Sequence, residues 1–240
     1  KGSTCYFSDR TKIPFVSALL NSVVANELLK ILAPTLDYNA GSIAKIPVIW
    51  EENYCPQITK LFEEAVQLSK VDWDSFETSW DFTRHPFIKA ITKYPNMMDI
   101  GNIYIAECYD IWAGECEERF EKLKANEEEL NRIFIDIYGL QDELTPEVED
   151  KDVTVRKADL QRDIKSLLSY AVGCMFGRYS LDVEGLAYAG GEWDSSKYQS
   201  YIPDADNVIP ITDEEYLDDD IVSRLCDWLK VVYGADTLEA

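Results

Sequence analysis

Lysine and arginine side chains gather at the start of one predicted helix, at a spacing that could hold a nucleic-acid backbone. Lys157, Gln161 and Lys165 are four residues apart, so they share one helix face, and Arg156 and Arg162 flank it. Such a stripe can neutralise a few phosphates of a duplex. A solvated face that pairs with acidic side chains of a neighbouring helix has the same spacing, so both interpretations stand at this point.

The first fifty residues form a second basic region. They carry five lysines and arginines against three acidic residues, a net charge of +2, so the other 190 residues carry −24. An acidic body of this kind argues against a protein that grips nucleic acid over its whole surface. We therefore expect phosphate contacts at a few positions, namely Lys12, Lys45, Lys157, Arg162 and Lys165.

The sequence shows no convincing catalytic constellation. It holds no GxGxxG, no P-loop and no GxSxG motif. Glu149 and Lys151 have the E-x-K spacing of a metal-dependent nuclease half-site, but they lie in a predicted loop, and such triplets are frequent in acidic chains. The acidic run 218–220 is better explained as a solvated helix start. His85, the one histidine, precedes Pro86 and is expected to be structural.

Composition places the chain among soluble proteins. No apolar run approaches the roughly 20 residues that a membrane span needs, and no secretory signal is present. Six scattered cysteines without a CxxC pair indicate reduced thiols, and with a single histidine they argue against a metal site. We expect a cytoplasmic protein with no membrane partner. The start at Lys1, without a methionine, is compatible with a piece of a longer protein.

A long helix must position much of this chain. From 102 to 140 apolar residues recur at steps of three and four, which predicts one amphipathic helix about 50 Å long that ends at Gly139. A helix with one apolar stripe needs a partner. Residues 158–172 have the same periodicity, and we expect them to lie antiparallel to the C-terminal half of the long helix. Gly173 and Gly177 then permit close backbone approach.

Before the long helix the pattern mixes short strands with helices. Strands are predicted at 4–7, 36–38 and 46–49, and helices begin near Pro14 and at Pro56. The next stretch, from Trp73 to Tyr94, is dense in aromatic side chains. The simpler interpretation is an irregular connector whose rings pack on a core. The alternative, a platform that stacks exposed bases, is weakened by the interleaved acids.

The expected fold class is mainly α: a helical bundle with a long amphipathic helix, preceded by a small incomplete α/β segment. The last helix should run from about 214 to 233, with Thr212 and Glu215 as its capping box and Gly234 as its end. Three regions follow from these patterns: 1–50, a mixed α/β segment; 51–100, a helix and an aromatic-rich connector; and 101–240, a helical domain.

Several stretches resemble a known family of enzymes. Residues 18–48, with LNS, PTLDY and GSIAKIPV, look like the end of a target-recognition domain of adenine-specific DNA methyltransferases of restriction–modification type, and of the related specificity subunits. ELNRI and IYGL, within 129–140, resemble a segment found downstream in the same enzymes. Residues 124–180 and 185–191 are similar to the C-terminal region of the PglX methyltransferases of phage-exclusion (BREX) systems.

The resemblance implies a non-catalytic C-terminal fragment of an adenine-specific DNA methyltransferase from a phage-defence or restriction–modification system. Ala33 and Asp37 stand where the family usually has asparagines, which are mild departures. The family's catalytic N-P-P-Y motif and its cofactor-binding glycines are not in this sequence, so no catalytic residue and no cofactor is implied for this chain. The parent enzyme would use S-adenosylmethionine to methylate adenine N6 in double-stranded DNA.

Two functions from different classes follow. In the first, the chain supports DNA target recognition within the full-length enzyme, and 1–50 is the end of the recognition domain. In the second, it is an acidic helical module that docks other defence-system proteins, which the charge of −24 over 51–240 favours. A nuclease built around Glu149 and Lys151 is a third, weaker interpretation, so whether this chain is itself an enzyme stays open at this point.

Overall fold

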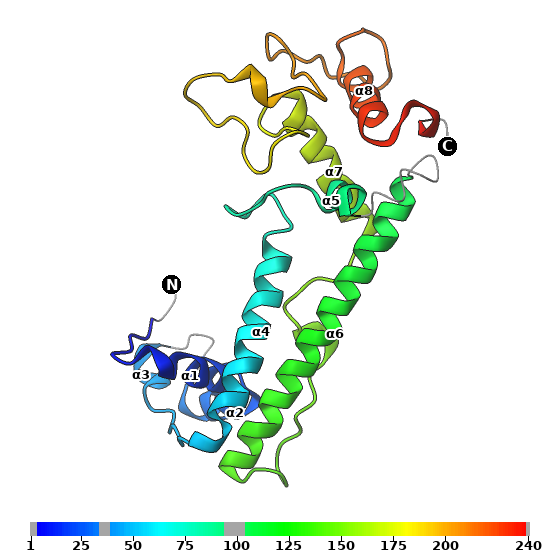
Figure 1. Ribbon diagram of the computed structural model, residues 1–240. Coiled ribbons are helices and arrows are strands. Elements are labelled where there is room, and N and C mark those ends of the chain that lie inside the picture. The colour runs from blue at the N-terminus through cyan, green and yellow to red at the C-terminus, as the bar shows by residue number, and fades with distance from the viewer. Residues whose placement is uncertain (1–3, 34–38, 94–103, 239–240) are drawn as a thin grey trace. The chain divides into compact units, whose positions relative to one another are not determined.

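The computed structural model describes residues 4–33, 39–93 and 104–238 of the chain. It divides into two compact units: the first unit comprises 1–70 and 118–156, and the second unit comprises 71–117 and 157–240. The residues described hold no β-strand, and the prediction of a mainly α protein is confirmed (Figure 1). The α-helices are α1 (Ile13–Leu20), α2 (Val23–Leu32), α3 (Ala40–Ile43), α4 (Cys55–Trp73), α5 (Pro86–Lys93), α6 (Ile105–Tyr138), α7 (Leu160–Met175) and α8 (Ile221–Tyr233).

The first unit packs short helices against the C-terminal part of α6. α1 has Pro14 in its first turn, as predicted, and its Phe15 meets Phe134 of α6 edge to face, with ring centres 5.4 Å apart. Figure 1 shows α4 beside α6, and Ile58 of α4 is fully buried in the same core. Burial of these apolar faces is what stabilises helices that are too short to persist alone.

Two of the predicted strands are wrong. Residues 4–7 and 46–49 have no strand structure, and the third predicted strand, 36–38, lies outside the described residues. Tyr138 of α6 explains the second case, because its hydroxyl donates to the carbonyl of Pro47 and accepts from the N–H of Ile49 at 3.4 Å. A side chain of α6 therefore satisfies backbone groups that would otherwise need a neighbouring strand.

The long helix is present as α6, and Gly139 ends it with φ of 67°, as the sequence predicts. The predicted second helix is also present, as α7, but its predicted partner is wrong. α7 packs on the N-terminal part of α6, where Tyr170 and Leu167 share a core with Trp112.

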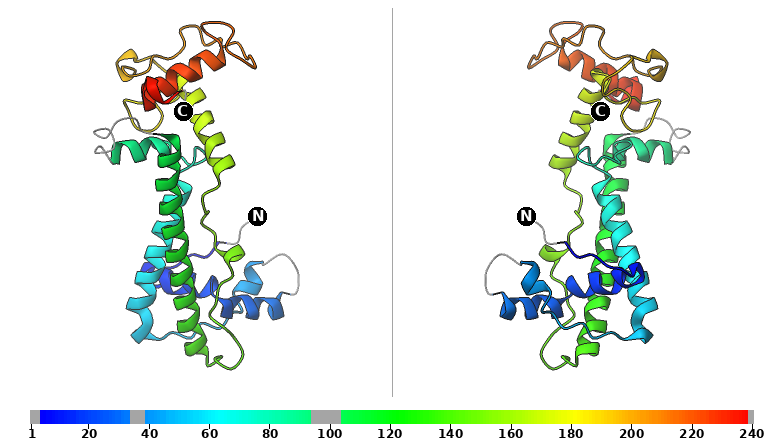
Figure 2. Two further views of the ribbon diagram at one scale, coloured as in Figure 1. Left: turned by 90° about the vertical axis from the view of Figure 1, so that its right-hand side faces the viewer. Right: turned by 90° about the vertical axis from the view of Figure 1, so that its left-hand side faces the viewer.

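The chain between the two helices explains this difference. After α6 it runs back alongside the C-terminal part of that helix (Figure 2), where Val153 and Val155 are buried with Phe120 and Leu123. An extended residue advances about 3.3 Å and a helical residue about 1.5 Å, so a short extended segment passes several helical turns. This segment covers the part of α6 on which α7 was predicted to pack. The helix α7 begins only after this segment ends.

The second unit surrounds α7 with α5, the N-terminal part of α6 and α8. Trp228 of α8 is fully buried, and its ring lies 6.4 Å from that of Tyr170 in a T-shaped arrangement. Residues 74–85 form an irregular connector, as predicted, and Phe82 anchors it against Tyr170 and Tyr179 at 6.0 and 5.5 Å. The sequence did not predict the helix α5 that follows this connector.

The last helix begins later than predicted. Its N-cap is Asp220, which is fully buried and accepts hydrogen bonds from the N–H groups of Tyr216, Leu217 and Ser223. These donors stabilise the carboxylate and hold the pKa of Asp220 well below its usual range. The predicted capping box at 212–215 is therefore wrong, because no helix starts there and the cap of α8 is Asp220. Gly234 ends α8 as predicted.

Glu127 on α6 predicts a pH-dependent stability. Burial raises the pKa of Glu127 to about 7, so its ionised form is disfavoured in the folded chain and stability falls as pH rises through 4.5 to 7. We expect Glu127→Gln to stabilise the chain by about 1 kcal/mol at pH 8, a value reduced for solvent screening, and by less at pH 5. Urea unfolding at both pH values measures this, with Glu118→Gln on the same helix as the control. Equal effects at both pH values would contradict the prediction.

Neither a membrane span nor a metal-ligand cluster stands out in the part of the chain that is described. No single helix there is long and apolar enough to cross a bilayer, and only the bent pair Arg10–Leu20 and Val23–Leu32 meets that test together. No group of three or more histidine, cysteine or acidic side chains is arranged to hold a metal ion among these residues.

Candidate nucleic-acid interface

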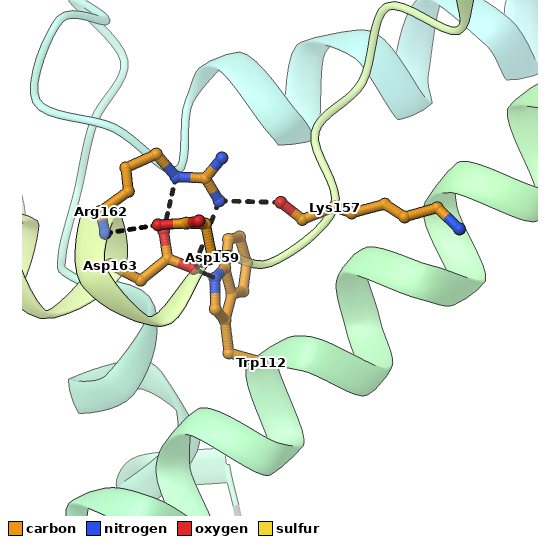
Figure 3. Close-up of polar contacts among 5 residues, drawn as sticks. All are labelled: Trp112, Lys157, Asp159, Arg162 and Asp163. Atoms are coloured by element: carbon orange, nitrogen blue, oxygen red, sulfur yellow. Dashed lines mark hydrogen bonds and ion pairs between the residues drawn. The ribbon is translucent and has the colours of Figure 1, made fainter. Parts of the chain in front are cut away.

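Two aspartates hold the N-terminus of α7 (Figure 3). Asp159 is the N-cap, and its carboxylate accepts from the N–H of Arg162 at 2.7 Å. Asp163 is 2% exposed and accepts from the indole N–H of Trp112 and from the backbone N–H of Asp159, both at 3.0 Å. Carboxylates at this end of a helix complement its dipole. The network therefore fixes the first turn of α7 against α6.

Arg162 belongs to this network. Its Nε donates to Asp163 at 2.7 Å, and one terminal nitrogen donates to the carbonyl of Lys157 at 2.9 Å. The guanidinium lies 5.4 Å from the centre of the Phe76 ring, and the side chain keeps 34% of its surface exposed. The arginine predicted to contact phosphate is thus a clamp at the start of α7 that also reaches solvent.

Lys157 and Lys165 are both at the surface, but the prediction that they share a helix face is wrong, because α7 begins at Leu160 and Lys157 precedes it. The ammonium of Lys157 pairs with Glu117 of α6 at 2.9 Å, and both side chains are exposed. An exposed pair of this kind contributes about 0–1 kcal/mol, so a phosphate can compete for the lysine. Lys165 is exposed and forms no ion pair with any residue that the structure describes. Of the predicted stripe, Lys165 is therefore the most available cation.

The two lysines of the first unit lie near its N-terminal helices. Lys12 is exposed at the start of α1, and its Nζ lies 5.7 Å from the centre of the Trp50 ring. That ring packs on Phe15 at 4.5 Å. Lys45 is exposed just after α3. The structure thus leaves both lysines at the surface, while Trp50 gives Lys12 an aromatic support that the sequence did not predict.

Sequence reasoning missed what Asp163 does. The basic spacing around it assigns no role to Asp163, whereas in the structure Asp163 joins Arg162, Trp112 and the cap of α7 in one buried cluster. The only sequence signal was a second acid four residues after an N-cap aspartate, one turn along the helix. The tryptophan partner lies 51 residues away, so no local pattern identifies it.

The other candidates from the sequence form no catalytic arrangement in the residues described. His85 is 2% exposed, its Nδ1 accepts from the N–H of Phe87 at 3.3 Å, and burial lowers its pKa to about 3. It is a neutral structural side chain, as predicted. Glu149 and Lys151 are exposed and pair with each other at 2.6 Å.

Comparison with known proteins finds two similar enzymes, while no family model matches the chain. The chain is 45% identical over 240 residues to the adenine-specific methyltransferase PglX of Lacticaseibacillus casei (strain Zhang), covering 99% of this chain and 19% of that protein. It is 30% identical over 257 residues to the adenine-specific methyltransferase BrxX of Escherichia coli O9:H4 (strain HS), covering 98% and 20%. The chain spans about a fifth of the length of these curated relatives.

Proposed function

From the relationship of this chain to the PglX-type adenine-specific methyltransferases, we propose that it is a non-catalytic part of such an enzyme and that it supports DNA target recognition. The complete enzyme would transfer a methyl group from S-adenosylmethionine to adenine N6 in a phage-defence system. It would turn the adenine out of the duplex to reach it. This part would help to hold the duplex while the chemistry takes place elsewhere.

The observation that carries the proposal is the 45% identity to an adenine-specific methyltransferase over nearly the whole chain. The absence of an N-P-P-Y motif from the sequence supports the non-catalytic role. The residues described also do not fit the cofactor, because they contain no strand and hence no strand, glycine turn and helix of the kind that holds an adenine-containing cofactor.

Exposed lysines at a few positions are the groups proposed to contact phosphates. Lys45 and Lys165 are the first candidates, followed by Lys12, supported on Trp50, and by Lys157, which would exchange its acidic partner for a phosphate. Contacts with phosphates fix position on a duplex and carry no sequence information by themselves. Arg162 would act mainly by positioning, through its clamp on α7.

Charge reversal tests this proposal. In the chain and in the full-length enzyme, Lys45→Glu and Lys165→Glu should each weaken duplex binding several-fold and reduce the slope of log affinity against log salt by about 1 to 2. Fluorescence anisotropy of a labelled duplex over a salt series measures both quantities. The controls are Lys60→Glu in the first unit and Lys230→Glu in the second, which make the same charge change on other exposed helix faces.

A second function, an acidic module that docks other defence-system proteins, is favoured by the charge of −24 over residues 51–240. Exposed apolar side chains near the C-terminal end add to it, such as Ile202, Val208 and Ile211 at 62, 66 and 86% exposure. The salt series separates the two functions. If no duplex binding is measured and both lysine variants leave methylation by the full-length enzyme intact, the DNA role is wrong and the docking role remains.

A further inference from the structure

A small pocket opens beside Trp80 in the second unit. It has a volume of about 170 Å³ and is lined by the connector and by the residues after α7, including Glu77, Phe82, Arg178 and Tyr179. Sites for drug-sized ligands are commonly about 300–1,000 Å³, so this one has room for a single small group. Phe82 is 5% exposed and Tyr179 is 2% exposed, and both pack on Tyr170, so this wall of the pocket is rigid.

The pocket places a carboxyl group near a guanidinium. Glu77 accepts from the hydroxyl of Ser169 at 3.3 Å through one oxygen, and the hydroxyl of Tyr179 also interacts with this carboxyl group, while the buried Oε1 has no hydrogen bond of standard geometry to the described residues. Arg178 donates from Nε to the hydroxyl of Tyr179 at 3.3 Å, and its guanidinium lies 5.6 Å from the centre of that ring. Its terminal nitrogens keep donors for a ligand. The lining of the pocket therefore offers both an acceptor and a donor.

Trp80 at the rim is 98% exposed. Because the indole is exposed to water, it does not contribute to the hydrophobic core, and its ring face is open to a ligand. Aromatic side chains of this kind stack on nucleobases regardless of sequence. The rest of the aromatic connector is different, since Phe82 is in the core and Phe76 lies under the guanidinium of Arg162.

We propose that this pocket receives one unstacked nucleobase of the DNA that the chain holds, with the base on Trp80 and its polar edge toward Glu77 and Arg178. The inference rests on the proposed function. A base edge presents donors next to acceptors, which matches this pair of side chains. A phosphate would meet the carboxyl group of Glu77, and a lysine or arginine of a protein partner would meet the guanidinium of Arg178, so neither fits as well.

Single-stranded DNA tests the site, because its bases need no unpairing. Trp80→Ala should weaken binding of the full chain to a labelled eight-nucleotide single strand about ten-fold, and Trp80→Phe should restore part of the affinity. Duplex affinity should change less than two-fold. Trp73→Ala is the matched control, since Trp73 is 52% exposed and does not line the pocket. Circular dichroism should show unchanged helix content in all three variants.

A change at Glu77 tests the polar edge separately. Glu77→Gln keeps the size of the side chain but adds a donor, so it should alter the relative affinity for oligo-dA, oligo-dC and oligo-dT at least three-fold. An unchanged single-strand affinity in Trp80→Ala, with duplex binding intact, would overturn the base site alone. The absence of duplex binding in the unaltered chain, together with intact methylation by the full-length Lys45→Glu and Lys165→Glu variants, would overturn the proposed function instead. Binding of N-acetyl-arginine amide at Trp80, with no binding of single strands, would assign the pocket to a protein side chain and overturn the base site.

Discussion

Asp163→Ala should lower the free energy of unfolding of the second unit by about 3–4 kcal/mol, as expected for removing one partner of a buried, charged hydrogen-bond cluster. Asp163 accepts from Arg162, from the indole of Trp112 and from the cap of α7. The alanine removes the carboxylate that accepts from the indole N–H of Trp112 in the core. The arginine loses less, because a third of its side chain already reaches solvent. Urea unfolding followed by circular dichroism measures the change.

Two variants check this explanation. Asp163→Asn keeps an acceptor for Trp112 but loses the charge next to Arg162, so its effect should lie between those of the parent and the alanine variant. Asp159→Ala removes an exposed N-cap and should cost about 1 kcal/mol. If Asp163→Ala costs no more than Asp159→Ala, the buried cluster does not stabilise the unit as argued.

Gly173→Ala should destabilise the second unit by about 2 kcal/mol, although alanine is normally the better helix former by up to about 1 kcal/mol. A Cβ at this position would lie 2.5 and 2.9 Å from two ring atoms of Tyr179. That ring cannot move away easily, because it is 2% exposed and stacks on Tyr170 at 5.0 Å. Thermal or urea unfolding of the variant measures the loss.

Gly114 of α6 provides the matched control. It is also inside a helix of the second unit, but nothing lies within 4 Å of an added Cβ. Gly114→Ala should therefore stabilise the chain by about 0.5–1 kcal/mol. Opposite signs at the two positions would support close packing at Gly173, and a stabilising Gly173→Ala would refute it.

Much of the fold could be predicted because the sequence signals for helices depend on residues that are close together in the chain. Apolar spacing identified α6 and α7, Gly139 and Gly234 marked two helix ends, and Pro14 marked a start. Gly173 in the last turn of α7 and Gly177 just after it do allow close approach, but by side chains instead of the predicted backbone: a Cβ on Gly177 would lie 2.8 Å from the ring of Trp193. Each of these signals depends on residues within one or two turns of one another.

The candidate site was less predictable, because the spacing of charged residues along the sequence does not show which acidic side chains pair with them in the folded chain. Arg162 and Lys165 are on α7 as predicted, but Lys157 precedes that helix, and the structure gives each of the three a different environment. Likewise, Trp80 and Phe82 belong to one aromatic run, and only the folded chain places the first in water and the second in the core.

The sequence by itself determined the longer helices α4, α6 and α7, where several helices begin and end, and which family the chain resembles. Tertiary structure decided how they pair. α7 packs on the N-terminal part of α6 because the extended segment with Val153 and Val155 already covers the C-terminal part. In the segment 46–49, which is not a strand, the hydroxyl of Tyr138 binds the carbonyl of Pro47 and the N–H of Ile49 in place of a neighbouring strand. In both cases, segments that are far apart in the sequence compete to pack on, or hydrogen-bond to, the same part of α6. The local periodicity of the sequence does not show which segment wins.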